Sequence, residues 1–448
     1  MSLTIFFIGI WFLVLYLSVN RLNKNIDIFS PVKLLSFLYL IRNVPYIFFT
    51  ALDINFFNER VLRYFNLYNE ITLDEAFVNY SIIQTIAFVF LILGIKSVYV
   101  KSNEVTLEPL IFFNKKVITM TIYIAFFIGF GGFLIFLKNV GGINFLLSNL
   151  DDRVNLQSGK HTLKLAPLMG ISTIFSILLI KLNGFKRIDY VRFFIFLIIS
   201  IICFSSTGGR KSTLYLLVLS FACYSYYIKR FSLKKIKKSR LVFISSLMFF
   251  YVFLMPVLRS KGGFNNLLNG EVSLVETIGL DKFFSTLSYT YIDVFAVNHF
   301  NKTNLWNFSS LLTIPSNLLD RKAAQDRPPM DEGTYFVTSI VRGGDYKPLI
   351  ARKELREFSF PIENMGFAYA NALLVGVIIF FFLQGKILAL LYRKFIHSHL
   401  NPFWFYIYVF CVFNFNFSSL RIMNLLTTSF LLMVFFILYK YMESVYEN

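Results

Sequence analysis

The chain has 448 residues, of which 56% are hydrophobic and only 15% are charged, and its formal net charge is +19. Apolar runs of about 18 or more residues, the length that crosses a bilayer core, recur along it. This composition excludes a soluble globular protein and predicts an all-α polytopic membrane protein. The positive charge does not indicate nucleic-acid binding, because membrane proteins concentrate Lys and Arg in their cytoplasmic loops.

The first apolar segment, SLTIFFIGIWFLVLYLSVN, is too long for the apolar region of a signal peptide and has no small-residue cleavage site before Arg21. We interpret it as the first of about eleven transmembrane helices. Hydropathy places them at 2–20, 31–52, 76–98, 117–137, 165–180, 191–206, 213–228, 241–257, 363–385, 402–420 and 424–440. The expected division is therefore 1–257 with helices 1–8, 258–361 as a large loop, and 362–448 with helices 9–11.

Orientation follows from the basic residues beside the spans. The loop KRFSLKKIKKSR, Lys229–Arg240, carries seven Lys or Arg and no acid, so we expect it in the cytoplasm. Alternation then places the N-terminus outside and the C-terminus inside. The long loop 258–361 falls outside, together with the loop 138–164 and the turn 207–212.

Metal binding and disulfide formation are not expected. The cysteines lie in apolar segments without CxxC spacing, and the histidines form no ligand cluster with them. These residues are Cys203, Cys223 and Cys411, and His161, His299, His397 and His399.

The long loop mixes charges with apolar and aromatic stretches such as FFSTLSYTYIDVFAVNHF and NLWNFSSLLTIPSNLL. A solvated loop explains the charges but not the aromatic stretches, which favour burial. We therefore expect an ordered, partly helical cap on the external face. Within it, IPSNLLDRKAAQDRPPMDEGTYF gathers acids and bases in one Pro-broken stretch, and VRGGDYKP adds a basic site at Arg342.

The turn TGGRKS places Arg210 and Lys211 at the start of a span, after two glycines that permit tight backbone conformations. A helix N-terminus beside a guanidinium suits an anion, and the guanidinium can bind two phosphate oxygens at once. The alternative is that both side chains reach up to lipid headgroups. The external loop 138–164 adds a third cationic place, with Arg153 and His161.

Two arginines are predicted inside the membrane. Arg42 lies in the second span before Pro45, and Arg421 lies between the last two spans beside Asn414 and Asn416. An intramembrane charge costs roughly 2.5 to 3.5 kcal/mol on insertion scales and usually lines a polar cavity. We expect both guanidinium groups to face the interior.

The arrangement of spans and late external loop, with the stretches TGGRKS, IPSNLLDRK and ENMGFAYANALLVGVIIFFFLQG, resembles the Wzy-type polymerases of O-antigen and related oligosaccharide repeat units. Members of that family often read Gly-Ser-Arg-Gly, Ile-Pro-Arg and Gly-Glu-x-Tyr in these stretches. Here Lys211 follows Arg210, Ser316 stands after Pro315, and no Glu directly precedes Tyr369. The identity of the catalytic base therefore stays open.

The resemblance implies a GT-C-like glycosyltransferase of the bacterial inner membrane. Such an enzyme moves a growing glycan from undecaprenyl diphosphate to a lipid-linked repeat unit at the outer leaflet, without a metal or other cofactor. A chain-length-regulating co-polymerase is an implied partner. The expected diphosphate-binding residues are Arg210, Lys211, Arg153, Arg259, Arg321, Arg327, Arg342 and Arg421. The candidates for the catalytic base are Asp320, Asp331, Glu332, Glu363 and His161.

Three alternatives remain. An O-antigen ligase shares the layout and donor, but the one histidine of the long loop, His299, lies in an aromatic stretch. A polysaccharide flippase or other transporter is expected to show repeated halves and broken helices, and no repeat is detectable here. A structural scaffold would not need so many cations at the outer boundary.

Overall fold

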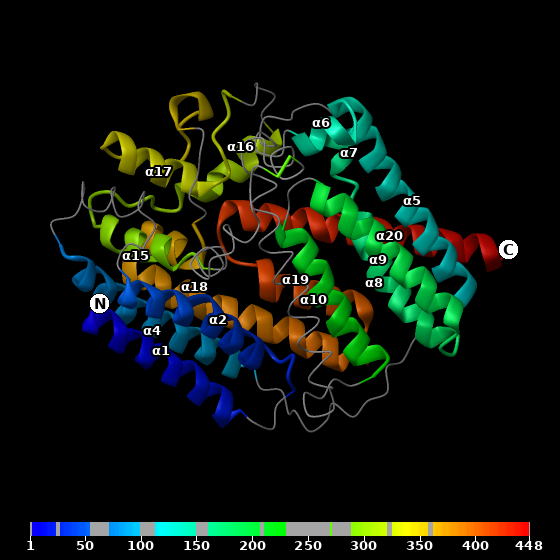
Figure 1. Ribbon diagram of the computed structural model, residues 1–448, viewed down its shortest axis with the longest axis horizontal. Helices are drawn as coiled ribbons and strands as arrows, with labels where there is room; N and C mark the ends of the chain where they lie inside the picture. The colour runs from blue at the N-terminus through cyan, green and yellow to red at the C-terminus, as the bar shows by residue number, and fades with distance from the viewer. Residues whose placement is uncertain are drawn as a thin grey trace. The chain divides into compact units, whose positions relative to one another are not determined.

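The computed structural model describes residues 2–23, 27–53, 71–98, 113–148, 160–206, 210–229, 269–270, 288–319, 325–356 and 362–447. These residues form helices joined by turns and loops, and no strand occurs among them (Figure 1). The helical fold class expected from the sequence is thus confirmed for the described part of the chain.

Several described helices can cross a membrane. Seven are long and apolar enough: α1 (Leu3–Leu22), α2 (Pro31–Leu52), α4 (Leu73–Lys96), α5 (Lys115–Val140), α9 (Arg187–Ser206), α18 (Asn364–His397) and α20 (Ser419–Glu447). Three other predicted spans fall on α8 (Pro167–Leu182), α10 (Arg210–Tyr227) and α19 (Pro402–Asn414), which do not meet the same test of length and composition. The predicted span 241–257 lies outside the described residues. A multi-pass membrane protein is confirmed, and the total of eleven spans stays a prediction.

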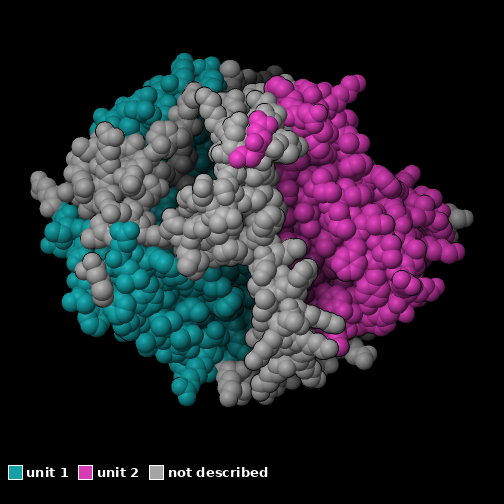
Figure 2. Space-filling view, viewed as in Figure 1, with its two compact units in different colours: residues 1–106, 280–397, 410–426 teal, residues 107–279, 398–409, 427–448 magenta. Residues whose placement is uncertain are grey.

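The chain forms two compact units, each assembled from separate stretches (Figure 2). Unit 1 comprises residues 1–106, 280–397 and 410–426, and unit 2 comprises residues 107–279, 398–409 and 427–448. Two of the boundaries, after residues 409 and 426, fall within α19 and α20. The expected division at 257 and 361 follows chain order, whereas the described part of the long loop from residue 288 onward belongs with the N-terminal helices of unit 1.

Unit 2 is built around α8. Nearly every residue of this helix is buried, and it packs between α5 and α9. The glycines of α5 allow this approach: a Cβ at Gly129 would lie 2.8 Å from the backbone nitrogen of Met169. Stacked rings of Phe126 and Phe196, with centroids 3.9 Å apart, join α5 to α9. The short helices α6 (Ile143–Ser148) and α7 (Lys160–Leu163) follow α5 in the chain.

Unit 1 places α4 and α18 in close contact. A Cβ at Gly94 would overlap the carbonyl oxygen of Phe382, and a Cβ at Gly385 would overlap that of Leu91. Small residues let helices in membranes approach closely enough for dense van der Waals packing. The two glycines therefore fix α18 against α4.

Local sequence signals set the ends of these helices. Thr72 and Glu75 form a capping box at the start of α4, in which each side chain bonds to the backbone of the other residue. Asn114 caps α5, whose last residue is followed by Gly141 with a φ of 106°. Only glycine adopts such a left-handed backbone without strain.

Helix α18 is sharply folded rather than continuous. Ala372 and Leu373 have non-helical dihedral angles, and Leu373 has a φ of 49°. The side-chain nitrogen of Asn364 donates to Gln384 Oε1 at 2.8 Å, although twenty residues of straight helix would extend about 30 Å. The expected single span 363–385 is therefore wrong. Only the part after the break, at about 1.5 Å per residue, is long enough to cross a bilayer.

The break in α18 is filled by the segment that follows α15 (Thr290–His299). The backbone nitrogen of Trp306 donates to Ala370 O at 2.9 Å, and that of Phe308 donates to Asn371 Oδ1 at 2.7 Å. A Cβ at Gly376 would overlap Ala368 O, so the fold also requires a glycine here. The first bond gives the backbone oxygen of Ala370 a donor at the interruption, and the second ties the Asn371 side chain to the same segment.

The remaining loop elements are ordered, as the sequence predicts for the cap. They are η4 (Ser309–Leu312), α16 (Thr313–Leu319), α17 (Glu332–Arg342) and η5 (Arg352–Glu354). Aromatic residues of this region are buried, among them Trp306, Tyr335 and Phe336. The α15 helix, which belongs to the same predicted loop, packs against α2, α4 and α18. The expected burial of the aromatic stretches is confirmed for the described residues.

We predict that Gly94→Ala lowers the thermal stability of the purified protein, because the added methyl group meets backbone that cannot move aside. Overpacking of this kind typically costs about 1 to 3 kcal/mol. Gly131→Ala is the matched control, since no atom lies within 4 Å of its Cβ position on α5. Melting curves in detergent measure both variants, and equal melting temperatures would contradict the packing described.

Candidate functional site

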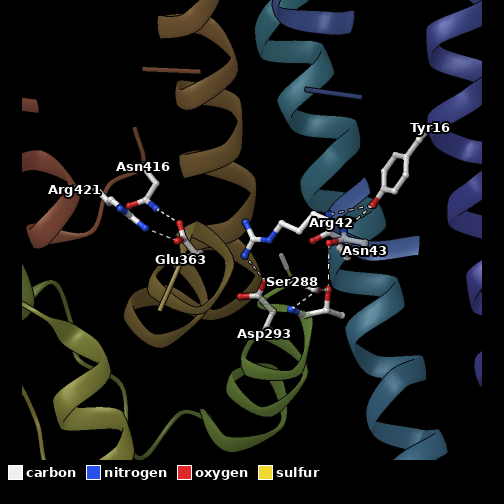
Figure 3. Close-up of polar contacts among 10 residues, drawn as sticks. Tyr16, Arg42, Asn43, Ser288, Asp293, Glu363, Asn416 and Arg421 are labelled. Atoms are coloured by element: carbon white, nitrogen blue, oxygen red, sulfur yellow. Dashed lines mark hydrogen bonds and ion pairs between the residues drawn. The ribbon is translucent and has the colours of Figure 1, made fainter. Parts of the chain in front are cut away.

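Four ionisable side chains from different parts of the chain meet inside unit 1. They are Arg42 on α2, Asp293 on α15, Glu363 just before α18, and Arg421 near the start of α20 (Figure 3). We call these four residues the charged cluster. Two guanidinium groups and two carboxyl groups give it a formal charge of zero when all are ionised, which reduces the cost of placing it in an apolar bundle.

Glu363 is held by two donors from one connection. Arg421 Nη2 donates to Glu363 Oε1 at 2.5 Å, and Asn416 Nδ2 donates to Glu363 Oε2 at 2.9 Å. The Arg421 and Glu363 side chains are 13% and 14% exposed. Charge-assisted bonds of this length fix the orientation of a carboxylate. Glu363 is therefore a preorganised acceptor at the edge of the interior.

Arg42 is less completely bonded. Its Nη2 atom lies 3.7 Å from Asp293 Oδ2, too far for a hydrogen bond. The Nε and Nη2 atoms are inaccessible to solvent and have no hydrogen-bond partner among the described residues. The Tyr289 ring lies 5.4 Å from the guanidinium carbon. The exposed 29% of the side chain does not include these two atoms, so Arg42 has unused donors that are enclosed by the surrounding helices.

A set of neutral polar side chains forms hydrogen bonds with Asn43, the residue next to Arg42. Asn43 Nδ2 donates to the Tyr16 hydroxyl at 3.1 Å, and Gln84 Nε2 donates to the same oxygen at 3.4 Å. On its other side, Asn43 Oδ1 accepts from Thr290 Oγ1 at 3.2 Å. These bonds join α1, α2, α4 and α15. They hold the turn of α2 that carries Arg42 against the first turn of α15, which carries Asp293.

A second polar connection holds the residue next to Glu363. Besides its bond to Gln384, Asn364 accepts from the backbone nitrogen of Phe417 at 3.4 Å through Oδ1. Gln384 Nε2 in turn donates to Phe415 O at 2.8 Å. Both contacts depend on the break in α18, which brings Asn364 back to Gln384. The break therefore sets where Glu363 lies.

Burial raises the pKa of Asp293 to about 7, although the nearby Arg42 favours the ionised form. The Glu363 carboxylate adds to the increase. A carboxyl group with a pKa near neutrality can exchange a proton under physiological conditions, and such groups are common at functional sites. Among the described residues, no group of three His, Cys, Asp or Glu could hold a metal ion.

The structure brings together two of the residues predicted for the site, Glu363 and Arg421. Glu332 is connected to the segment that carries Arg421: its carboxylate accepts from the backbone nitrogen of Ser419, two residues before Arg421. Asp331 instead caps α17 by accepting from Gly333 N at 3.2 Å.

Two predicted diphosphate ligands are engaged elsewhere in the cap. Arg327 Nη1 donates to Asn317 O at 3.4 Å, and Arg342 Nη1 donates to Glu354 O at 2.6 Å. The Arg342 guanidinium also lies over the Tyr346 ring, 5.9 Å from its centroid. Neither arginine contacts the charged cluster in the described structure, so the cap uses both to order its own loops.

Other predicted residues cannot be placed against the cluster. Arg210 and Lys211 begin α10, and His161 lies in α7; both helices belong to unit 2. The side chains of these three residues fall outside the described part. Asp320, Arg153, Arg259 and Arg321 lie outside the described residues. The expected convergence of cations from separate external segments stays a prediction.

Asp293 is the member of the cluster that the sequence prediction missed. Among the charges of the long loop, this residue stands alone within the apolar stretch TYIDVFAV. The same signal, a charge inside an apolar run, singles out Arg42. Applied to the loop, it would have indicated that α15 is buried with its carboxylate facing a partner.

Comparisons with known proteins add no relative to this description. No family model, curated protein or solved structure matches the chain significantly.

We predict that stability falls as the pH rises from about 4 to about 7, partly because of Asp293. In the unfolded chain this carboxyl group titrates near 3.8, whereas in the folded protein it titrates near 7. Within this window the folded state holds a proton that the unfolded state has lost, so the free energy of unfolding decreases with increasing pH.

Asp293→Asn should flatten this slope, since the amide cannot titrate. Unfolding curves in detergent at several pH values measure the slope, and Asp326→Asn is the control, because Asp326 is exposed and pairs with Lys353 at the surface. An unchanged slope in Asp293→Asn would show that Asp293 titrates normally in the folded protein.

Proposed function

We propose that the protein is a membrane glycosyltransferase that polymerises oligosaccharide repeat units carried on undecaprenyl diphosphate. The observation that carries this proposal is the charged cluster, in which Arg42 has buried donors without partners and Glu363 is held by Arg421 and Asn416. A cation with free donors beside an oriented carboxylate matches the two needs of glycosyl transfer from a lipid diphosphate.

The first need is stabilisation of the leaving group. The bond between the anomeric carbon of the donor glycan and the diphosphate oxygen breaks, and its electron pair stays on that oxygen. Arg42 would stabilise this charge through its Nε–H and Nη–H groups, already placed before the reaction begins. The proposal gives this role to guanidinium groups and assigns none to a metal.

The second need is a base for the acceptor. A hydroxyl of the acceptor repeat unit forms the new bond to the anomeric carbon and gives up its proton, which we assign to Glu363. Arg421 and Asn416 would orient this carboxylate. Among the other candidates that the structure describes, Asp331 caps α17 and Glu332 is only 2% exposed. The Glu363 side chain, by contrast, is 14% exposed and interacts with Arg42.

The setting of the reaction is part of the proposal. We place the protein in the bacterial inner membrane, with its N-terminus in the periplasm, its C-terminus in the cytoplasm and the charged cluster open to the outer leaflet. A GT-C-like arrangement of about eleven spans and regulation by a chain-length co-polymerase accompany this assignment. Its supports are the apolar helices and the positions of the basic loops.

A flippase for lipid-linked oligosaccharides is the second candidate, and the broken helix α18 favours it. Transporters typically build their substrate sites from discontinuous membrane helices. The break at Ala372 and Leu373 lies in the helix that presents Glu363. An O-antigen ligase is less favoured, because His299 is buried among Phe295, Phe300 and Phe336, and burial lowers its pKa to about 4.

Deletion of the gene separates these functions. For a polymerase, we expect lipid A–core to carry single repeat units, because flipping and ligation continue without polymerisation. For a ligase or a flippase, no repeat unit should reach lipid A–core. Electrophoresis of lipopolysaccharide measures the outcome, and normal long-chain ladders after deletion would contradict all three functions.

Glu363→Gln should reproduce the single-repeat phenotype when it replaces the wild-type chain at equal abundance. The amide retains the shape of the side chain but cannot accept the acceptor's proton. Glu443→Gln is the control, because Glu443 pairs with Lys440 near the surface, outside the charged cluster. Full ladders in Glu363→Gln would exclude Glu363 as the base and leave Asp320 and His161.

Arg210→Ala tests the expected contribution of unit 2. If Arg210 binds the diphosphate, this variant should also give single repeat units at normal protein abundance. If its side chain only contacts lipid headgroups, ladders should stay normal. Immunoblotting of membranes controls for the amount of protein.

A further inference from the structure

Glu332 is a buried carboxylate whose partner lies far away in the chain. It occupies the first position of α17, is 2% exposed, and accepts from Ser419 N at 2.5 Å. Ser419 is the first residue of α20, so a carboxylate from one helix caps the N-terminus of another. Free N–H groups and a partial positive charge at a helix N-terminus favour such an anion.

The start of α20 depends on this contact because its own residues are otherwise engaged. The Ser418 hydroxyl donates to Asn416 Oδ1 at 2.7 Å, and the Ser419 hydroxyl donates to Ser310 O at 2.7 Å. The first turn is thus tied to α17 by Glu332 and to η4 by Ser310. Both ties come from the cap region, and neither comes from α20 itself.

The two residues that hold Glu363 flank this point. Asn416 precedes Ser419 by three positions, and Arg421 follows it by two. A shift or fraying of the first turn of α20 would move both donors away from the Glu363 carboxylate. The bond from Ser419 N to Glu332 is thus one route by which Glu332 acts on the two donors of Glu363.

We propose that Glu332 is a positioning residue: by capping α20 at Ser419, it holds Arg421 and Asn416 where they orient Glu363. The expected effect on activity rests on the proposed function. The capping of α20 by Glu332 does not depend on it. It also reinterprets Glu332, which the sequence suggested as a base. A base must reach the acceptor hydroxyl, whereas the Glu332 carboxylate is enclosed and bonded to backbone.

Several groups surround the carboxylate, and burial raises the pKa of Glu332 to about 7. Asp331 on α17 adds to the increase, and the bonds with Ser419 oppose it. Tyr335 is the other titratable group that interacts with Glu332. Opening of the first turn of α20 would let water reach the carboxyl group and return its pKa towards 4.5, so the closed form loses stability as the pH rises from about 5 to about 7.

The test compares Glu332→Ala and Glu332→Gln with wild type in the full-length protein, reconstituted in lipid nanodiscs. Hydrogen exchange of peptides covering 415–426 reports the order of the first turn of α20, and glycan ladders in cells report activity. In Glu332→Ala we expect at least several-fold faster exchange in these peptides and loss of long chains. Glu332→Gln keeps a carbonyl oxygen for Ser419 N–H, so it should retain much of both.

The pH dependence of exchange at 415–426 is a second readout. It distinguishes loss of the Glu332 cap from general unfolding. Exchange at 415–426 in the wild type should quicken as the pH is raised from about 5 to about 7, after correction for the intrinsic exchange rate. Glu332→Gln should show no such step, because its amide does not titrate. Glu354→Gln is the control, since Glu354 is exposed on η5, and Arg342 contacts only its backbone oxygen.

The outcomes separate the two proposals. Unchanged exchange at 415–426 in Glu332→Ala would overturn the positioning role, whatever the glycan result. Loss of ladders in Glu332→Gln with normal exchange would also overturn it and would make Glu332 the base. Faster exchange in Glu332→Ala, with a deletion phenotype that is not single repeats, would support the cap and refute the polymerase.

Discussion

The pairing of Arg421 and Asn416 with Glu363 is the interaction on which the rest of unit 1 depends. A carboxylate among apolar helices is stable only with donors that replace its hydration. Both donors come from the connection between α19 and α20, so the fold must bring that connection to the start of α18. Arg42 and Asp293 pose the same problem and solve it less completely, with a separation of 3.7 Å. The two pairs thus differ in geometry: Arg421 and Glu363 are hydrogen-bonded, whereas Arg42 and Asp293 are not.

Small residues make this arrangement sterically feasible. Gly94 and Gly385 remove the side chains that would separate α4 from α18, and Gly376 allows the two parts of α18 to meet. The segment at Trp306 and Phe308 then donates to the Ala370 backbone oxygen and to the Asn371 side chain. Glycine at these positions is therefore a packing requirement, and the polar cluster is assembled by helices that approach unusually closely.

Much of this fold could be predicted from the sequence. Hydropathy located ten of the predicted spans on helices, because a stretch of apolar residues has few other solutions in a bilayer. It also predicted that Arg42 and Arg421 face the interior. The break in α18 could not be predicted, because no proline marks it, and isolated Asn and Gly residues such as Asn371 and Gly376 also occur within unbroken membrane helices. Asp293 was missed because the long loop was treated as external. Like Arg42, however, Asp293 is a single charge inside an apolar run.

The fold of α18 also constrains the chain in a way that composition does not reveal. Residues 364–371 form a short arm that returns Glu363 along the helix instead of extending it beyond the end. One residue inserted into this arm would rotate the carboxylate by about 100° around the helix axis and displace it by about 1.5 Å. The number of residues in the arm should thus be conserved more strictly than their identity. Substitutions can drift there, while insertions and deletions would disconnect the acid from its donors.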